Sequence, residues 1–224
     1  MASPGGEVLK LATQFYTIAY NSNKLKGAAI PTSMQDLLKP QYKGRIAATP
    51  YLAGFDVLAT PEFWGLQRTL DFTKAFAGQV GGLVRCGETN RLVDGEFDVL
   101  ALECNQRGEL KGKAQGQPID FVIPSDAAMN YYLNMAIPKN APHPNAAKLF
   151  ANYMLTRQGQ DIAYKLGYLD LNLLPGSHSE QDIKKLEDRG VKFHALDLAF
   201  LMKQNAVEDA RIRKQLQGII QKTG

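Results

Sequence analysis

Strand-like and helix-like segments alternate along most of this sequence, and the alternation limits the folds that it can adopt. Residues 15–20 are aromatic and β-branched, as strands often are, and the turn-forming residues 21–23 follow them. Further strands are predicted at 45–49, 81–85, 97–102, 119–123 and 131–137. Helices are predicted at 34–38, from 55, and at 61–76, 88–93 and 144–155. This order favours α/β layers in which helices cover a mixed sheet.

The last quarter of the chain departs from this alternation. Helices are predicted at 180–189 and 197–221, with no strand between them. An exposed loop is predicted at 108–117, because that stretch is rich in Gly and Lys.

Charge and hydropathy argue against two classes of partner. The chain has 26 Lys and Arg against 22 Asp and Glu, a formal net charge of +4. Its densest basic stretch, 211–214, shares a helix with Glu208 and Asp209, which favours a solvated face over a nucleic-acid site. No stretch approaches the roughly 18 apolar residues needed to span a bilayer, so no direct membrane insertion is expected. Residues 1–6 carry no secretion signal, which has been removed or was never present.

The sequence contains two cysteines, Cys86 and Cys104. They form one disulfide bridge or remain two buried thiols, and their spacing leaves both alternatives open. Neither lies in a Cys/His cluster, so a structural zinc site is disfavoured.

Motifs for catalysis are missing. His143, His178 and His194 have no nucleophile motif beside them, and no G-x-S-x-G, P-loop or dinucleotide fingerprint occurs. Glu96 and Asp98 begin a predicted strand, where they are expected to face water instead of acting as an acid–base pair. The sequence therefore disfavours an enzyme and indicates no cofactor.

Three stretches, in this order, resemble one protein family. Residues 31–46 match the pattern P-x-S-x-x-D-L-x-x-P-x-x-K-G-x-I, and residues 92–99 match L-x-x-G-E-x-D-V. Residues 136–150, followed by T-R-Q-G-Q at 156–160, are similar to the family's return strand and the helix after it. The family is that of the extracellular solute-binding proteins of bacterial ABC importers, in the branch that includes iron(III), thiamine, polyamine and phosphonate binders.

The resemblance implies a type II periplasmic-binding-protein-like α/β fold, in which two α/β lobes are joined by two crossover strands. It places the first crossover strand and a remnant of lobe one at 1–24, and lobe two at 25–130. The second hinge strand falls at 131–144 and the return helices of lobe one at 145–224. The expected hinge residues are Tyr20, Asn21, Tyr132 and Leu133. Family members carry several lobe-one elements before the first crossover, so one complete lobe and an incomplete second lobe are expected.

The same resemblance implies a function in transport. The protein would capture a small organic solute, anionic or amine-bearing, in an interlobe cleft and deliver it to an ABC permease with its ATPase subunits. It would work in the periplasm or outside the cell, and it would not bind nucleic acid. The main alternative is the ligand-sensing domain of a transcription regulator, normally preceded by a helix-turn-helix; an enzyme is the weaker alternative. An incomplete lobe could also complete its sheet with a second copy, which leaves the oligomeric state open.

Candidate contacts for the solute lie where strands end, because ligands of open α/β sheets bind at the carboxyl ends of strands, near helix N-termini. The candidates from four such ends are Thr49, Tyr51, Leu52, Ala53, Gly54, Glu88, Thr89, Glu103, Asn105, Ser125 and Asp126. The N–H groups of 52–54 are suited to an anion, and Glu88 to a cationic group. Turns, caps and solvated charges are the ordinary alternative roles for these residues.

Adjacent tyrosines raise the question of iron(III). In the iron binders that the sequence resembles, such a pair follows the strand after the G-E step, where this chain has Glu103, Cys104 and Asn105. Tyr131 and Tyr132 lie instead on the predicted second hinge strand, where alternate side chains face opposite ways. Packing in the core or hinge is therefore favoured for them, and no metal site is predicted.

Overall fold

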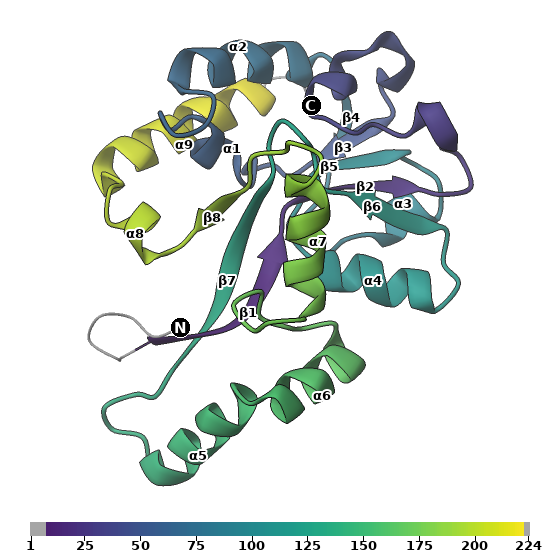
Figure 1. Cartoon of the computed structure of the whole chain (residues 1–224). Helices are drawn as coiled ribbons and strands as arrows, with labels where there is room; N and C mark the ends of the chain where they lie inside the picture. The colour runs from purple at the N-terminus through teal and green to yellow at the C-terminus, as the bar shows by residue number, and fades with distance from the viewer. Residues whose placement is uncertain (1–7, 222–224) are drawn as a thin grey trace. The chain divides into compact units, whose positions relative to one another are not determined.

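The structure is a computed structural model that describes residues 8–221, apart from the side chains of 206 and 207. Of the expected lobe-one remnant 1–24, residues 1–7 lie outside the described part. The described chain forms two compact units: unit 1 contains 8–14 and 129–202, and unit 2 contains 15–128 and 203–221. Each unit combines strands with helices, which confirms the predicted α/β class (Figure 1).

Unit 2 is built on a five-stranded sheet with the order β4-β3-β5-β2-β6. Its strands are β2 (Thr17–Asn21), β3 (Ile46–Ala48), β4 (Val80–Leu83), β5 (Val99–Glu103) and β6 (Ile119–Val122). Strand β3 pairs in parallel with β4 and β5, whereas β2 pairs antiparallel with β5 and β6. Consequently β3, β4, β5 and β6 all run in one direction, and their carboxyl ends meet at one edge of the sheet. This edge is called the carboxyl edge below.

Aromatic packing organises the helices of unit 2. Helices α1 (Phe55–Leu58) and α2 (Leu66–Ala77) contribute Phe55, Phe72 and Phe76, and Trp64 precedes α2. Their ring centroids lie 5.1–6.0 Å apart. Shorter elements complete the unit: the 3-10 helices η1 (Gly27–Ala29), η2 (Gln35–Leu38) and η3 (Pro40–Tyr42), and helix α3 (Asn90–Val93).

Helix α2 starts five residues later than its sequence pattern predicts. Residues 60–65 form turns, in which the N–H groups of Phe63 and Gly65 donate to the carbonyl of Thr60. Gly65 has φ of 77°, a conformation that a helix cannot include and that glycine adopts easily.

The predicted loop at 108–117 is wrong, because helix α4 (Gln106–Ala114) occupies most of it and packs on β6. The Thr17 hydroxyl donates to the fully buried carboxyl group of Glu109, which fixes the helix to β2. A Cβ on Gly112 would lie 2.6 Å from Gln117 Oε1 and 2.9 Å from Ile119 Cγ2. Glycine at 112 thus allows α4 to approach β6 closely, a role that composition alone does not reveal.

The C-terminal segment belongs to unit 2, whereas the family resemblance placed all of 145–224 in lobe one. Helix α9 (Ala206–Ile220) packs on α1 and α2, with Leu216 and Ile220 buried. Arg213 Nε also lies 2.9 Å from Asp56 Oδ2. The single helix predicted at 197–221 is split, because turns at 202 and 203 separate α9 from the short helix α8 (Leu198–Leu201).

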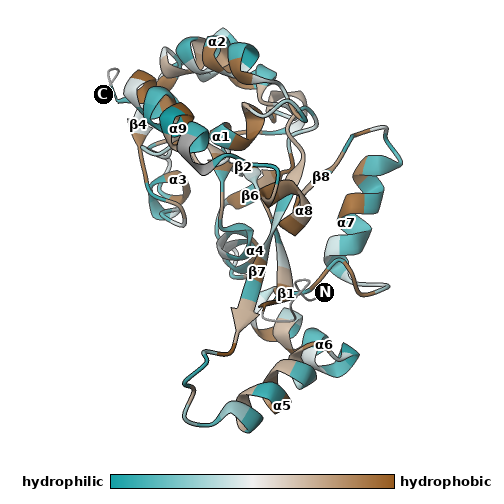
Figure 2. Ribbon diagram, turned by 90° about the vertical axis from the view of Figure 1, so that its left-hand side faces the viewer, coloured by the Kyte–Doolittle hydropathy of each residue, from teal (hydrophilic) through white to brown (hydrophobic). Residues whose placement is uncertain are grey.

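Unit 1 contains a three-stranded sheet with the order β1-β7-β8. Its strands are β1 (Val8–Phe15), β7 (Met129–Ala136) and β8 (His194–Leu196), and β8, which the sequence did not predict, pairs in parallel with β7. Besides α8, the helices are α5 (Pro144–Met154), α6 (Arg157–Gly167) and α7 (His178–Glu187). Exposed apolar side chains occur on α5 and α6, including Leu149 and Leu166. Both helices carry hydrophobic as well as hydrophilic residues (Figure 2). Within residues 8–221, none of the helices is long and apolar enough to cross a membrane.

The predicted hinge residues lie in regular strands near unit boundaries. Tyr20 and Asn21 are in β2, just after the chain enters unit 2 at residue 15. Tyr132 and Leu133 are in β7, which begins where the chain returns to unit 1 at residue 129. Their role as hinges stays a prediction.

Candidate functional site

The four groups of candidate residues all follow strands that end at the carboxyl edge of unit 2. Residues 49–54 follow β3, 86–89 follow β4, 103–105 end and follow β5, and 125–126 follow β6. Since those strands share one direction, the topology brings four separate parts of the sequence to one edge of a sheet.

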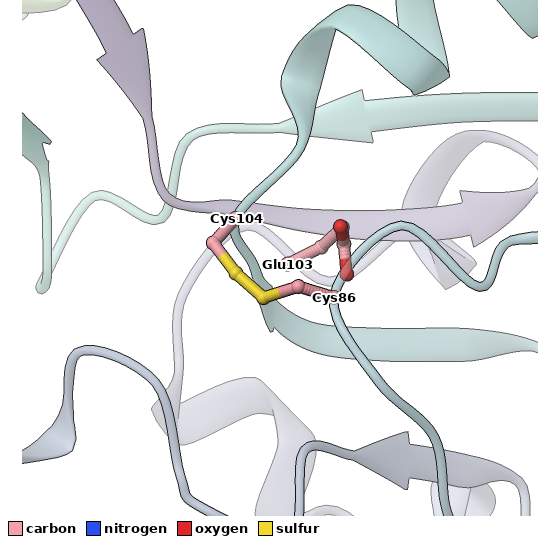
Figure 3. Close-up of side chains that lie close together, drawn as sticks. All are labelled: Cys86, Glu103 and Cys104. Atoms are coloured by element: carbon pink, nitrogen blue, oxygen red, sulfur yellow. A yellow bond between two sulfur atoms is a disulfide. The ribbon is translucent and has the colours of Figure 1, made fainter. Parts of the chain in front are cut away.

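Direct contacts tie the first three groups together. The N–H of Cys86 donates to the Tyr51 hydroxyl oxygen at 3.0 Å, and the N–H of Gly87 donates to Glu103 Oε1 at 2.8 Å. A disulfide joins Cys86 to Cys104, whose Cα atoms lie 5.6 Å apart. Figure 3 shows the Glu103 side chain beside this disulfide. The loop after β4 is therefore fastened to the end of β5 by a covalent bond and by a partly buried hydrogen bond.

The loop at 49–54 uses most of the N–H groups that the sequence suggested for an anion. The N–H of Leu52 donates to the Thr49 carbonyl at 3.0 Å, and the N–H of Ala53 donates to Thr49 Oγ1 at 2.9 Å. Gly54, at φ 81°, then starts a helix of only four residues. Two of the three N–H groups are thus engaged within the loop, and the exposed Tyr51 side chain is its most accessible polar group.

Asp126 also has a structural task. Its carboxylate accepts from the N–H of Met34 at 2.7 Å and of Gln35 at 3.2 Å, at the start of η2. The Asp126 carbonyl accepts from Trp64 Nε1 at 2.7 Å. Of the fourth group, the exposed Ser125 is therefore the better candidate for a solute contact.

Thr89 and Asn105 are the candidates least committed to the fold. Each precedes a helix, α3 or α4, yet neither side chain makes a capping hydrogen bond. Glycines make room for the Asn105 amide: a Cβ on Gly87 would lie 3.0 Å from its Nδ2, and one on Gly108 would lie 2.7 Å away. Glu88, in contrast, accepts from the N–H of Arg85 at 2.8 Å and closes a turn.

Two buried carboxyl groups lie in unit 2: that of Glu103, at the end of β5, and that of Glu109, in α4. Burial raises the pKa of Glu103 to about 6, although backbone N–H groups of Gly87, Asn105 and Cys104 oppose the rise. Burial also raises the pKa of Glu109 well above its ordinary value, while the hydrogen bond from Thr17 opposes the rise and the nearby Glu103 adds to it. Glu109 and Thr17 were missed from the sequence, where each resembles an ordinary surface-helix or strand residue. The sequence around Thr17 and Glu109 contains no pattern that would have identified them.

The adjacent tyrosines Tyr131 and Tyr132 belong to the other unit. Both lie on β7 in unit 1, and Tyr132 is buried with Lys10 Nζ 4.1 Å from its ring centroid. Among the residues described, Cys86, Glu103 and Cys104 are the one group of three potential metal ligands that lie close together.

Comparison with protein families decides which proteins this chain is related to. The family model of the bacterial extracellular solute-binding proteins matches residues 1–204. The chain belongs to this family. Membership confirms the resemblance seen in the three sequence stretches, and the carboxyl edge is the part of this solute-binding protein on which its candidate contacts converge.

Individual relatives of this solute-binding protein are distant. An uncharacterized protein of Haemophilus influenzae is 29% identical over 171 residues, which are 70% of this chain and 46% of the relative. The Fe(3+)-binding periplasmic protein of Serratia marcescens is 38% identical over 72 residues, 31% of this chain and 21% of that protein. The chain thus spans less than half the length of these curated relatives.

A solved structure shows the same fold. The substrate-binding protein of an ABC transporter from Agrobacterium tumefaciens superposes with a TM-score of 0.76 at 13% sequence identity. The match covers 98% of this chain and 69% of that one. At this identity the likeness shows the fold alone, which agrees with the predicted type II periplasmic-binding architecture.

Proposed function

We propose that this protein captures a small organic solute at the carboxyl edge of unit 2 and serves an ABC importer in the periplasm or outside the cell. The observation that carries the proposal is the family match over residues 1–204. The convergence of four strand-end groups on one edge supports it, because ligands of open α/β sheets bind there. An ABC permease and its ATPase subunits are the partners that follow from this function, and no catalytic step is assigned.

The side chains that suit this function best are those of Tyr51, Thr89, Asn105 and Ser125. They offer hydroxyl and amide groups, which can orient a solute through hydrogen bonds of either polarity. Glu88 adds a carboxylate that suits an amine-bearing solute. The start of α1 is a poor anion site. This helix has only four residues, and the N–H groups of Leu52 and Ala53 before it already donate to Thr49.

Iron(III) is the alternative that the Serratia relative raises. A hard, highly charged cation prefers oxygen anions such as phenolates and carboxylates. At the carboxyl edge the one tyrosine among the candidates is Tyr51, and the three candidate carboxylates of Glu88, Glu103 and Asp126 already accept backbone hydrogen bonds. An organic solute therefore fits this set of groups better.

A thermal-shift panel tests the proposal with organic acids, phosphonates, polyamines, thiamine and iron(III) citrate. We expect one organic class to raise the melting temperature of the chain, and Asn105→Ala to abolish that rise. The control is Asn23→Ala, an exposed amide just past the end of β2, at the opposite edge of the sheet. Turnover of a panel compound, or stabilisation by iron(III) without any by organic compounds, would contradict the proposal.

A further inference from the structure

One cluster of side chains at the carboxyl edge has a chemistry that solute binding does not use. The sulfur atoms of Cys86 and Cys104 and a carboxylate oxygen of Glu103 all lie within 4.8 Å of one another (Figure 3). Glu103 is 1% exposed, whereas both cysteines are partly accessible. In the oxidised chain the two sulfurs are bonded to each other and cannot act as thiolate ligands.

Reduction changes this cluster into a set of metal ligands. A dithiol reductant transfers two electrons and two protons to the disulfide, so that the S–S bond breaks, two thiols form and the reductant becomes a disulfide. Two thiolates and one carboxylate are ligands that zinc accepts, and a water molecule can complete the tetrahedral set of four. We propose that Cys86, Cys104 and Glu103 bind zinc, or a divalent cation of similar softness, when the disulfide is reduced.

The backbone geometry suits this site. Two thiolates on one tetrahedral zinc lie roughly 3.8 Å apart, given Zn–S bonds of about 2.3 Å. The Cα atoms of Cys86 and Cys104 are 5.6 Å apart, so rotation of the two side chains can reach that separation while the backbone stays in place. The hydrogen bond from Gly87 to Glu103 also holds the loop of Cys86 against the carboxylate.

Glu103 keeps capacity to bind a cation while it holds that loop. An ionised carboxylate has about four lone-pair sites, of which backbone N–H groups fill only a part. A buried carboxylate is an expensive group unless a positive charge or hydrogen bonds compensate it, and a divalent cation supplies that charge. On binding, the two thiols release their protons to solvent as the two metal–sulfur bonds form.

The site would be hidden wherever the surroundings are oxidising. The periplasm and the extracellular space keep such cysteines paired, and the bridge there fastens the loop after β4. The chain would then bind the metal only after the bridge is reduced, whether or not it binds an organic solute.

Titration with Co²⁺, followed by competition with Zn²⁺, tests the proposal on the whole chain. A phosphine reduces the disulfide to two thiols and becomes the phosphine oxide, with oxygen from water. We expect the reduced chain to bind one Co²⁺ with the visible absorption of tetrahedral thiolate coordination, and the oxidised chain to lack this spectrum. Glu103→Gln should weaken the affinity roughly tenfold or more, since even outer ligand partners contribute that much. Glu187→Gln, an exposed carboxylate of unit 1, is the matched control and should bind as the unmutated chain does.

A second measurement covers the case in which the reduced chain unfolds. Zinc should raise the melting temperature of the reduced chain, or restore its folded circular dichroism, because metal binding adds to folding free energy. The same zinc should act less on reduced Glu103→Gln. Equal affinity and equal stabilisation in both proteins would overturn the three-ligand site, as would a reduced chain that binds neither ion.

Discussion

Thr17 and Glu109 show how a single buried pair fixes an element that the sequence does not predict. The Thr17 hydroxyl lies 2.7 Å from Glu109 Oε1 and 3.0 Å from Oε2, and both side chains are buried. Burial of a carboxyl group costs free energy unless it is hydrogen-bonded, so this bond determines whether α4 can lie against β2.

Replacing Thr17 by valine should destabilise unit 2 by about 1–3 kcal/mol, because the shape is kept while the buried carboxyl group loses its donor. Chemical denaturation of the oxidised chain measures the change. Thr89→Val is the matched control, since the Thr89 side chain makes no capping bond. If the two variants lose the same free energy of unfolding, the Thr17–Glu109 bond does not anchor α4.

Glu109 also makes the stability depend on pH. Because its folded-state pKa is raised above the ordinary 4.5, its contribution to stability is present below that value and is lost as pH rises through the folded-state pKa. Relative to Glu109→Gln, the unmutated chain should therefore lose free energy of unfolding as pH is raised. Urea denaturation at a series of pH values measures the difference. Parallel curves for the two proteins would show that Glu109 titrates normally.

At the scale of elements, backbone contact explains where glycines are needed. A Cβ on Gly81 in β4 would lie 2.2 Å from the Gly44 carbonyl oxygen, whereas a Cβ on Gly218 in α9 would meet nothing within 4 Å. The first glycine permits a close approach of two backbone segments, and the second is a replaceable helix residue.

Two alanine substitutions test this distinction. Gly81→Ala should destabilise the chain by about 1–3 kcal/mol, because backbone must shift to remove the clash. Gly218→Ala should stabilise it by about 0.5–1 kcal/mol, since alanine is the better helix former. Thermal melts of both variants measure the changes, and effects of the same sign would contradict the assigned roles.

Local pattern predicted the elements better than their limits. Strands are predicted at 45–49 and 97–102, and β3 and β5 lie there. The start of α2 and the helix α4 are not predicted, because they depend on turn geometry at Gly65 and on the buried partner of Glu109. The Thr17–Glu109 contact joins residues 92 positions apart, so no short window of sequence contains both of them.

For the whole molecule, the order of motifs gave the family and the fold, but not the grouping of the C-terminal helix. The strand ends that carry the candidate residues could be found from the sequence, since parallel strands bring their ends together. Which of those side chains already have partners could not: Asp126 and Thr49 engage backbone N–H groups, whereas Asn105 makes no capping bond.

Packing of α9 on unit 2 is a consequence that stability can test. Leu216 is 1% exposed and Leu166 in unit 1 is 79% exposed. Leu216→Ala should cost about 2–5 kcal/mol, as buried leucines do, whereas Leu166→Ala should change stability by less than about 0.5 kcal/mol. If chemical denaturation gives the same change in free energy of unfolding for both variants, α9 is not part of the folded unit 2.

Solute binding at the carboxyl edge is most directly tested by isothermal titration calorimetry with the organic compound that stabilises the chain most. Thr89→Ala and Asn105→Ala together should weaken its affinity at least about tenfold, a loss of about 1.4 kcal/mol that one well-placed hydrogen bond can supply. Asn23→Ala should leave the affinity unchanged. Equal affinity in all three proteins would contradict a solute site at this edge.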